Sequence, residues 1–314
     1  MVKTKATPQD GTHKQVTLSA IVGPSVIDVT QEHNPITTHQ FSEVVKTFLF
    51  SAVSTILWVR DLLPDSYFRT VFYASINKYC SYRDFTYGRV DQAVAQSDRP
   101  RSKGYHLRVL KRDASIRGDQ IIKWLASVFE AIQLGYLSQL QISIFADANR
   151  PREVLELYCF HFQYLPSRDG SIVANIEVED VKNKRAVSLK DAREALNTVI
   201  KNMVGLNGTM PCLPERCYMS PYLVWNERRP SGYQPPGFHP YGDENISFPV
   251  TEGWAIETSI CGNIKAGPQA VNLGVAYMKE IGFNDSGEAV VMPDFNYGET
   301  FNRLEAAHPG ADLH

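Results

Sequence analysis

The segment from Phe41 to Leu63 constrains the fold of this 314-residue chain more than any other stretch. Its apolar side chains recur at three- and four-residue steps, and further apolar residues lie on the other sides of the same helix. A helix with several apolar faces must be buried on more than one side. Thr37, followed by Gln40, predicts a capping box at its start, and Pro64 cannot continue it. A few polar side chains should mark the side that reaches water: Glu43, Lys46 and Arg60.

Composition places the chain among ordinary globular proteins. Hydrophobic residues make up 43% and charged residues 21%, and the formal net charge is -2 at pH 7. This balance argues against a surface that binds nucleic acid as a whole, although a local basic patch is compatible with it. No apolar run approaches the roughly 20 residues of a membrane span, and residues 1–15 lack the apolar stretch of a signal peptide. We therefore expect an intracellular protein without membrane contact and with reduced cysteines: Cys80, Cys159, Cys212, Cys217 and Cys261.

Beyond the first helix, the pattern predicts two more helices and several strands. Asp113 or Ser115 suits the cap of a helix at 117–137, and Ser188 suits the cap of another at 189–204, which Gly205 and Gly208 would end. Two-residue alternation predicts neighbouring strands at 139–147 and 154–164, because a short turn joins them. Similar signals predict further strands at 67–79, 105–110, 171–179 and 218–225.

The last part of the chain departs from this order. The stretch from Arg228 to Gly242 is so rich in Pro and Gly that it predicts an irregular crossing. Two short strands are expected next, at 253–261 and 271–281, joined by the sequence GNIKAGPQ. Because they lie far in sequence from the strand at 218–225, this region should travel across the surface before pairing.

The sequence lacks the common catalytic motifs. The chain has no phosphate-binding loop, no GxSxG elbow, no HExxH pair and no Gly-rich dinucleotide turn. Cys212, Cys217 and His239 carry side chains that bind metals, but a second paired motif is missing. His161 lies inside an alternating strand and is interpreted as a structural histidine. We therefore expect a protein that is not an enzyme and that holds neither a cofactor nor a metal.

The densest positive charge lies in the segment 99–117. It lacks the interleaved aromatic residues of a nucleic-acid platform, so a solvated loop and strand edge is the simpler interpretation. An alternative function, binding of DNA or chromatin, would be carried by Arg99, Arg101, Lys103, Arg108, Lys111 and Arg112.

Three blocks of the sequence resemble HORMA-domain proteins, in particular the meiotic chromosome-axis branch. The blocks are VRDLLPDSYF (Val59 to Phe68), the segment from Trp124 to Asp147, and the segment from Leu213 to Phe238. They fall in the order of the family, over roughly residues 38–282. The Tyr-x-Pro-Pro-Gly-Phe element that begins at Tyr233 separates the meiotic branch from the spindle-checkpoint and translesion-polymerase branches.

The resemblance implies an α+β HORMA fold, in which three helices pack on a mainly antiparallel sheet. It places the domain at 37–282, between a flexible tail at 1–36 and a tail or linker at 283–314. The C-terminal part, at about 233–281, corresponds to the safety belt of the family. In the closed state the belt crosses the sheet and traps an extended peptide, the closure motif. This agrees with the Pro/Gly crossing and the displaced strands that the residues predict by themselves.

The implied function is a non-enzymatic, peptide-binding scaffold of the meiotic chromosome axis in the nucleus. It would support homologue pairing, synapsis, recombination and checkpoint control. A HORMA adaptor of the spindle checkpoint or of DNA repair is the alternative within the family. The strand at 218–225 and the belt would carry peptide binding through Tyr218, Tyr222, Leu223, Trp225, Trp254, Ile256, Ile260, Val271, Val275 and Tyr277.

The implied partners are closure-motif peptides of axis proteins and an AAA+ remodelling ATPase. The ATPase would engage residues 1–36. Axis proteins of the family usually continue past this domain and carry their own closure motif. A chain that ends at His314 is therefore either a fragment, whose full-length C-terminus supplies the peptide, or a protein that takes its peptide from partners.

Overall fold

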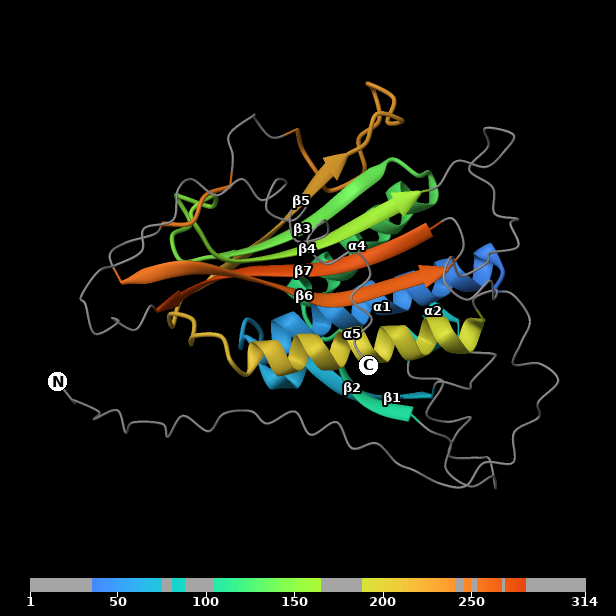
Figure 1. Cartoon of the computed structure of the whole chain (residues 1–314), viewed down its shortest axis with the longest axis horizontal. Helices are drawn as coiled ribbons and strands as arrows, with labels where there is room; N and C mark the ends of the chain where they lie inside the picture. Colours follow the sequence, from blue (N-terminus) through green and yellow to red (C-terminus); the bar gives the residue numbers. More distant parts are fainter. Residues whose placement is uncertain are drawn as a thin grey trace.

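The computed structural model describes residues 36–74, 81–87, 104–164, 188–240, 246–249, 253–266 and 269–280. Within these ranges, three long helices pack on one side of a five-stranded antiparallel sheet (Figure 1). A separate two-stranded sheet packs against the central helix. This is the predicted α+β architecture.

Helix α1 (Thr38–Val59) is the central helix predicted from the sequence. The predicted capping box is confirmed: Thr37 Oγ1 accepts a hydrogen bond from the Gln40 amide at 3.2 Å, and Gln40 Oε1 accepts one from the Thr37 amide at 2.9 Å. By length and composition alone α1 could cross a membrane, but it lies buried within the protein. It contacts three helices, α5 (Leu189–Asn207), α4 (Ile116–Gln133) and the short α2 (Tyr82–Tyr87), and also strand β2 (Gly104–Leu110).

Helix α4 (Ile116–Gln133) has Ser115 as its N-cap. Of the two cap residues that the sequence allowed, Asp113 and Ser115, the second is therefore the one used. Its hydroxyl accepts a hydrogen bond from the Gly118 amide at 2.9 Å. The helix ends earlier than predicted, just before Gly135, whose φ of 69° suits a helix end. Helix α5 (Leu189–Asn207) begins with a capping box of Ser188 and Asp191, and Gly208 caps its end. The prediction that Gly205 stops this helix is wrong.

The main sheet has the strand order β5-β3-β4-β7-β6, with every neighbouring pair antiparallel. Strands β3 (Leu137–Phe145) and β4 (Val154–Tyr164) are neighbours, as predicted. Strand β5 (Tyr218–Trp225) pairs with the other side of β3. Strands β6 (Trp254–Ala266) and β7 (Gln269–Glu280) form a hairpin, and β7 pairs with β4.

The β6–β7 hairpin is longer than the sequence suggested. The segment GNIKAGPQ was expected to join two short strands, but most of it is paired, with Ile264 opposite Val271 and Ala266 opposite Gln269. Ile264 and Val271 are both buried in the main core, which explains why the strands continue through a segment that contains Gly.

The second sheet pairs β1 (Phe68–Ala74) with β2 (Gly104–Leu110), after a short 3-10 helix (Asp65–Tyr67). The predicted strand at 105–110 is confirmed, and the one at 67–79 is confirmed as far as residue 74. The predicted strand at 171–179, the tail at 283–314 and residues 1–35 of the other tail lie outside the described residues.

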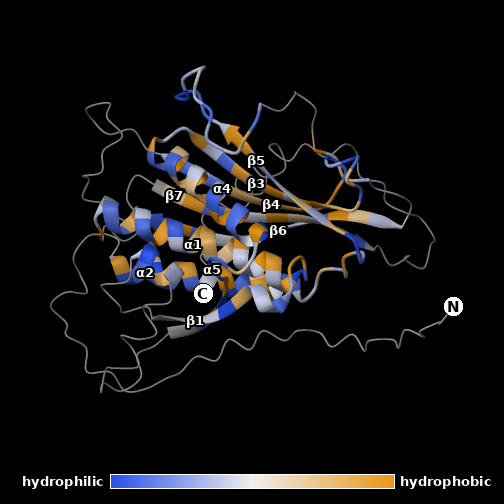
Figure 2. Cartoon of the chain, turned by 180° about the vertical axis from the view of Figure 1, so that it is seen from behind, coloured by the Kyte–Doolittle hydropathy of each residue, from blue (hydrophilic) through white to orange (hydrophobic). Residues whose placement is uncertain are grey.

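Two apolar clusters cover the two faces of the main sheet. The larger one lies between the sheet and the helices, along which apolar and polar residues alternate (Figure 2). The smaller one lies on the opposite face, where Phe248 and Ile246 pack on residues of β4 and β7: Val154, Leu157, Cys159, Ala276 and Met278. The chain that follows β5 therefore contributes to both faces of the sheet.

Candidate functional site

Strand β5 forms one edge of the main sheet. Among the described residues β3 is its one strand neighbour, with Tyr218 opposite Phe145 and Trp225 opposite Leu137. An edge strand presents a row of unpaired main-chain N–H and C=O groups on its outer side. Such a row can pair with an extended peptide as an added strand.

The main chain of β5 shows which residues face outward. In an antiparallel pair, alternate residues exchange both hydrogen bonds with the neighbouring strand. The Asn226 amide donates to Tyr136 O at 3.0 Å, and Ser220 O accepts from Ser143 Oγ at 3.2 Å, so the even-numbered residues face β3. The outward main-chain groups are those of the odd-numbered residues Met219, Pro221, Leu223 and Trp225.

The side chains of β5 alternate between the two faces of the sheet. Met219, Leu223 and Trp225 pack against the main core on the helix side. On the opposite face, Tyr218 stacks on Phe145 with ring centroids 5.7 Å apart. Tyr218 is nevertheless 44% exposed and Val224 is 36% exposed, so apolar surface flanks the edge.

After β5 the chain enters a crossing segment, residues 226–253. Its first part is anchored on the helix side by Tyr233. The ring of this tyrosine packs edge-on against Tyr136 at 5.1 Å and against Trp225 at 5.8 Å. The Tyr233 amide also donates to Pro230 O at 3.0 Å, which closes a turn. The crossing segment is thus fixed at the end of β5.

The Tyr-x-Pro-Pro-Gly-Phe element forms a second turn directly after this anchor. The Phe238 amide donates to Pro235 O at 3.3 Å, and Gly237 has a φ of 82°. Proline at the second position and a residue with positive φ at the third are typical of a type II turn, which explains why glycine stands here. Phe238 then packs against the main core.

The far part of the crossing segment is anchored on the opposite face, at the other end of the sheet. Ser247 bridges to the start of β4: its carbonyl accepts from the Val154 amide at 2.8 Å, and its amide donates to Arg152 O at 2.9 Å. Between its two anchors the segment changes from one face of the sheet to the other. In Figure 1 the residues directly after β5 form a loop beyond the end of that strand, whereas Ile246 and Phe248 pack on β4 and β7.

The predicted peptide-contacting residues fall into two groups. Those of β5 lie at the open edge, whereas those of the hairpin lie on β6 and β7, separated from β5 by β3 and β4. Val271, Val275 and Tyr277 are at most 2% exposed and belong to the main core. Ile256 packs on the opposite-face cluster, Ile260 is exposed, and Trp254 is half-buried. The ten residues therefore do not form one surface.

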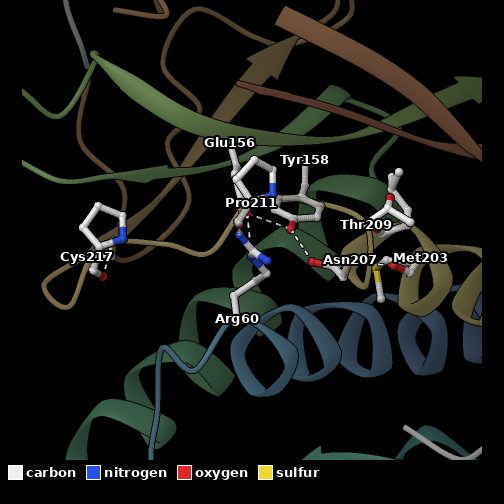
Figure 3. A network of polar contacts seen from close by, with 10 residues as sticks. Arg60, Glu156, Tyr158, Met203, Asn207, Thr209, Pro211 and Cys217 are labelled. Atoms are coloured by element: carbon white, nitrogen blue, oxygen red, sulfur yellow. Dashed lines mark hydrogen bonds and ion pairs between the residues drawn. The ribbon is translucent and has the colours of Figure 1, made fainter. Parts of the chain in front are cut away.

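A buried polar network joins α1, β4 and the end of α5 (Figure 3). Arg60, just after α1, makes two hydrogen bonds to the Glu156 carboxylate, one of them from Nε at 3.1 Å, and a third to Pro211 O at 2.6 Å. The side chains of Arg60 and Glu156 are only 6% and 3% exposed. The prediction that Arg60 marks a water-facing edge is therefore wrong, because its partner lies 96 positions away in sequence.

Tyr158 extends this network to α5. Its hydroxyl lies 2.9 Å from both Glu156 Oε2 and Asn207 Oδ1, and it can donate its proton to either oxygen. Burial raises the pKa of Glu156, while the Arg60 guanidinium and the Tyr158 hydroxyl act in the opposite direction. Through Pro211 the network also holds the segment that leads from α5 into β5, and so it helps to position the edge strand.

Three of the basic residues proposed for DNA binding have partners within the chain. Arg108 contacts Asp65 and lies over the Trp58 ring at 5.5 Å. Lys111 Nζ donates to Ser66 O at 2.9 Å, and Arg112 lies over the Tyr87 ring at 4.9 Å. Arg99, Arg101 and Lys103 lie outside the described residues. DNA binding through this segment stays a prediction.

The candidate metal and catalytic residues do not form a cluster in the part of the chain that the structure describes. No group of three or more His, Cys, Asp or Glu side chains suited to a metal occurs there. The Cys217 thiol instead donates to Pro214 O at 3.3 Å. His161 is half-buried, and burial lowers its pKa to about 4, so it is neutral at pH 7.

Comparison with known proteins identifies the class to which this fold belongs. A family profile for the HORMA domain matches residues 42–268, and the chain belongs to the HORMA domain family. Mouse HORMA domain-containing protein 1 is 24% identical over 237 residues, which are 75% of this chain and 50% of the relative. Mouse HORMA domain-containing protein 2 is 26% identical over 212 residues, 67% of this chain and 57% of the relative. The chain thus spans about half the length of these relatives.

Solved structures agree with this assignment at the level of the fold. C. elegans HTP-2 bound to HTP-3 closure motif 1 superposes with a TM-score of 0.56 at 16% identity, covering 81% of this chain and 97% of that one. C. elegans HTP-1 bound to the HIM-3 closure motif gives 0.54 at 15% identity, covering 79% and 100%. The HORMA fold predicted from three sequence blocks is confirmed.

Proposed function

We propose that this protein binds an extended peptide as an added strand along the outer edge of β5, beneath the crossing segment. The observation that carries the proposal is the edge of β5, which has no strand neighbour on its outer side among the described residues, in a chain whose crossing segment is anchored by Tyr233 on one face of the sheet and by Phe248 on the other. Each main-chain hydrogen bond to a guest contributes about 0.5–1.5 kcal/mol net. HTP-1 and HTP-2, which share the fold, are known with closure motifs bound.

The biological role that fits this site is a non-enzymatic scaffold of the meiotic chromosome axis, which captures closure-motif peptides of other axis proteins in the nucleus. The similarity to HORMA domain-containing proteins 1 and 2 supports this role. In that setting the protein supports homologue pairing, synapsis, recombination and checkpoint control by assembling partners rather than by chemistry.

The β6–β7 hairpin serves as the anchor of the belt in this proposal. Val271, Val275 and Tyr277 are buried in the core, and β7 pairs with β4 along its length. Full burial of each such side chain contributes about 1.5–3 kcal/mol. A peptide held beneath the belt therefore leaves slowly if the hairpin must detach first. An AAA+ ATPase that pulls on residues 1–36 would supply the work of reopening.

The test of strand addition uses the guest rather than the protein. Peptides of 12 residues, tiled over meiotic axis proteins, are displayed and selected for binding, and the tightest binder is remade with single N-methyl amides. Along one edge only alternate guest amides face β5. Within each stretch of the guest that pairs with β5, we expect binding measured by fluorescence anisotropy to fall at every second position and to persist at the positions between. Equal losses along the whole peptide would contradict strand addition, and a scrambled peptide serves as the control.

The anchor at Tyr233 should govern how long the guest remains bound. Its two aromatic pairs contribute about 0.5–1.5 kcal/mol each, so Tyr233→Ala should speed peptide dissociation about ten- to a hundredfold. Tyr233→Phe is the matched control, because it keeps the ring and removes only a hydroxyl that is buried without a partner in the described part of the chain. Stopped-flow dissociation of a labelled peptide measures both. Equal rates for the two variants would show that this ring does not hold the belt.

A further inference from the structure

Pro221 stands in the middle of the open edge of β5. The pairing with β3 runs from Leu223 through Pro221 to Met219 without a shift, with Pro221 opposite Ile142. A proline can occupy a paired strand in this way only where its missing N–H is not part of the ladder. The Asn226 and Ser220 contacts give the same result, since they place the odd-numbered residues outward. The ring of Pro221 therefore occupies the place of an outward N–H.

This placement changes what the edge offers to a guest. A strand added at the usual spacing of about 4.8 Å would direct a carbonyl group at the outward position of residue 221. There it would find the proline ring instead of a donor, so it would lose a hydrogen bond and also meet a steric obstacle. The remaining outward donors are divided: the amide of Met219 lies on one side of the ring, and the amides of Leu223 and Trp225 lie on the other.

We infer that Pro221 is a specificity-determining residue of the peptide site, an inference that rests on the proposed function. It admits an extended peptide that bends away from β5 opposite residue 221 and pairs on either side of the bend. It excludes a straight strand that pairs along the whole edge, including the β5 edge of a second copy. Glycine at or beside the bend is the residue that such a guest favours, because a bulge in a strand is least costly where a side chain is absent.

The two halves of the β5 edge should contribute unequally to the binding of a guest. Trp225 packs against Tyr233, so the half of the guest beyond the bend on that side lies next to the fixed start of the crossing segment. The half beside Met219 has fewer outward donors. A guest thus binds mainly through the Leu223–Trp225 side, and Pro221 sets where that paired stretch ends.

The experiment selects guests for two forms of the protein. A displayed library of random 12-residue peptides is panned against the unchanged protein and against Pro221→Ala, which restores the outward N–H and keeps every bond to β3. Pro64→Ala, at an exposed proline outside β5, controls for loss of a proline as such. We expect the unchanged protein and Pro64→Ala to enrich peptides with glycine at one fixed position, and Pro221→Ala to enrich straight, β-branched peptides without it.

Exchange of the selected peptides makes the result quantitative. A straight peptide selected on Pro221→Ala should bind the unchanged protein at least about tenfold more weakly, because it loses one hydrogen bond and meets the ring. A bent peptide should bind both forms within about twofold. Identical consensus sequences from both forms would overturn the role of Pro221 and leave the peptide site intact. Failure of both forms to enrich any peptide would overturn the proposed function, and this inference with it.

Discussion

Oxidation of a Gly274→Cys variant should stop this protein from loading peptide. Gly274 on β7 lies directly opposite the buried thiol of Cys159 on β4. Residues directly opposite each other in antiparallel strands have Cα atoms about 4.5–5.5 Å apart, which is within the range of a disulfide. The bond would fasten the belt to the body of the protein at the one junction that must part if the belt is to open.

The expected effect is large because the bond is covalent. Opening requires β7 to leave β4, and the two strands cannot part at the cross-link while the disulfide is intact. Peptide association measured by anisotropy should therefore be lost when the variant is oxidised and normal after reduction. Peptide that is loaded before oxidation should stay bound.

A variant that carries both Gly274→Cys and Cys159→Ser is the matched control, since it has the introduced cysteine and cannot form the bond. It should load peptide equally with and without oxidant. If the variant that retains Cys159 also loads equally in both states, and mass spectrometry confirms its disulfide, then peptide enters without release of β7 from β4. The belt would then be a fixed part of the sheet.

The helices of this fold were predictable because their ends are set by neighbouring residues. The caps at Thr37 and Ser188 each bond to a residue three positions on, so the sequence contains both partners side by side. The strands β3 and β4 were predictable for the same reason, since a short turn makes them neighbours. Local chemistry does not determine the order of the whole sheet, however. The pairing of β7 with β4 joins strands that are far apart in sequence, so only the structure shows it.

The candidate site shows the same division. Strand β5 and the Tyr-x-Pro-Pro-Gly-Phe element were found from sequence, the first by its alternation and the second by its resemblance. The sequence did not show which side chains of β7 face the core, because strict alternation defines two faces of a strand and does not say which of them is buried. Val275 and Tyr277 were thus assigned to peptide contact although they are core residues. Pro221 could have predicted that the strand at 218–225 lies at the edge of the sheet, because a proline within a strand is typical of an edge.

Removing one partner of the Arg60–Glu156 pair should strongly reduce the stability of this protein. Arg60→Met leaves the Glu156 carboxylate buried without its cation, and breaking a buried pair in this way costs about 3–5 kcal/mol. Urea unfolding measures the loss as a free energy of unfolding. Exposed Lys279, which pairs with Glu257 on the hairpin, provides the control: Lys279→Met should change the free energy by less than about 1 kcal/mol.

The loss caused by Arg60→Met should also depend on pH in a defined direction. Burial raises the pKa of Glu156, and removal of the guanidinium removes the main influence that lowers it. The folded variant then binds a proton more readily than the unfolded chain, so its stability rises as the pH falls and is lost as the pH rises. The difference from the unchanged protein should accordingly be smaller at pH 5 than at pH 8.

A second substitution separates the cost of an orphaned charge from the value of the pair. In the double variant with Arg60→Met and Glu156→Gln no buried charge remains, and glutamine can still accept from Tyr158. The double variant should therefore be more stable than Arg60→Met alone at pH 8, and its stability should lack the pH dependence that Glu156 contributes. A double variant that is less stable than the single one would mean that the Glu156 carboxylate contributes more through its contact with Tyr158 than it costs as a buried charge without a cation.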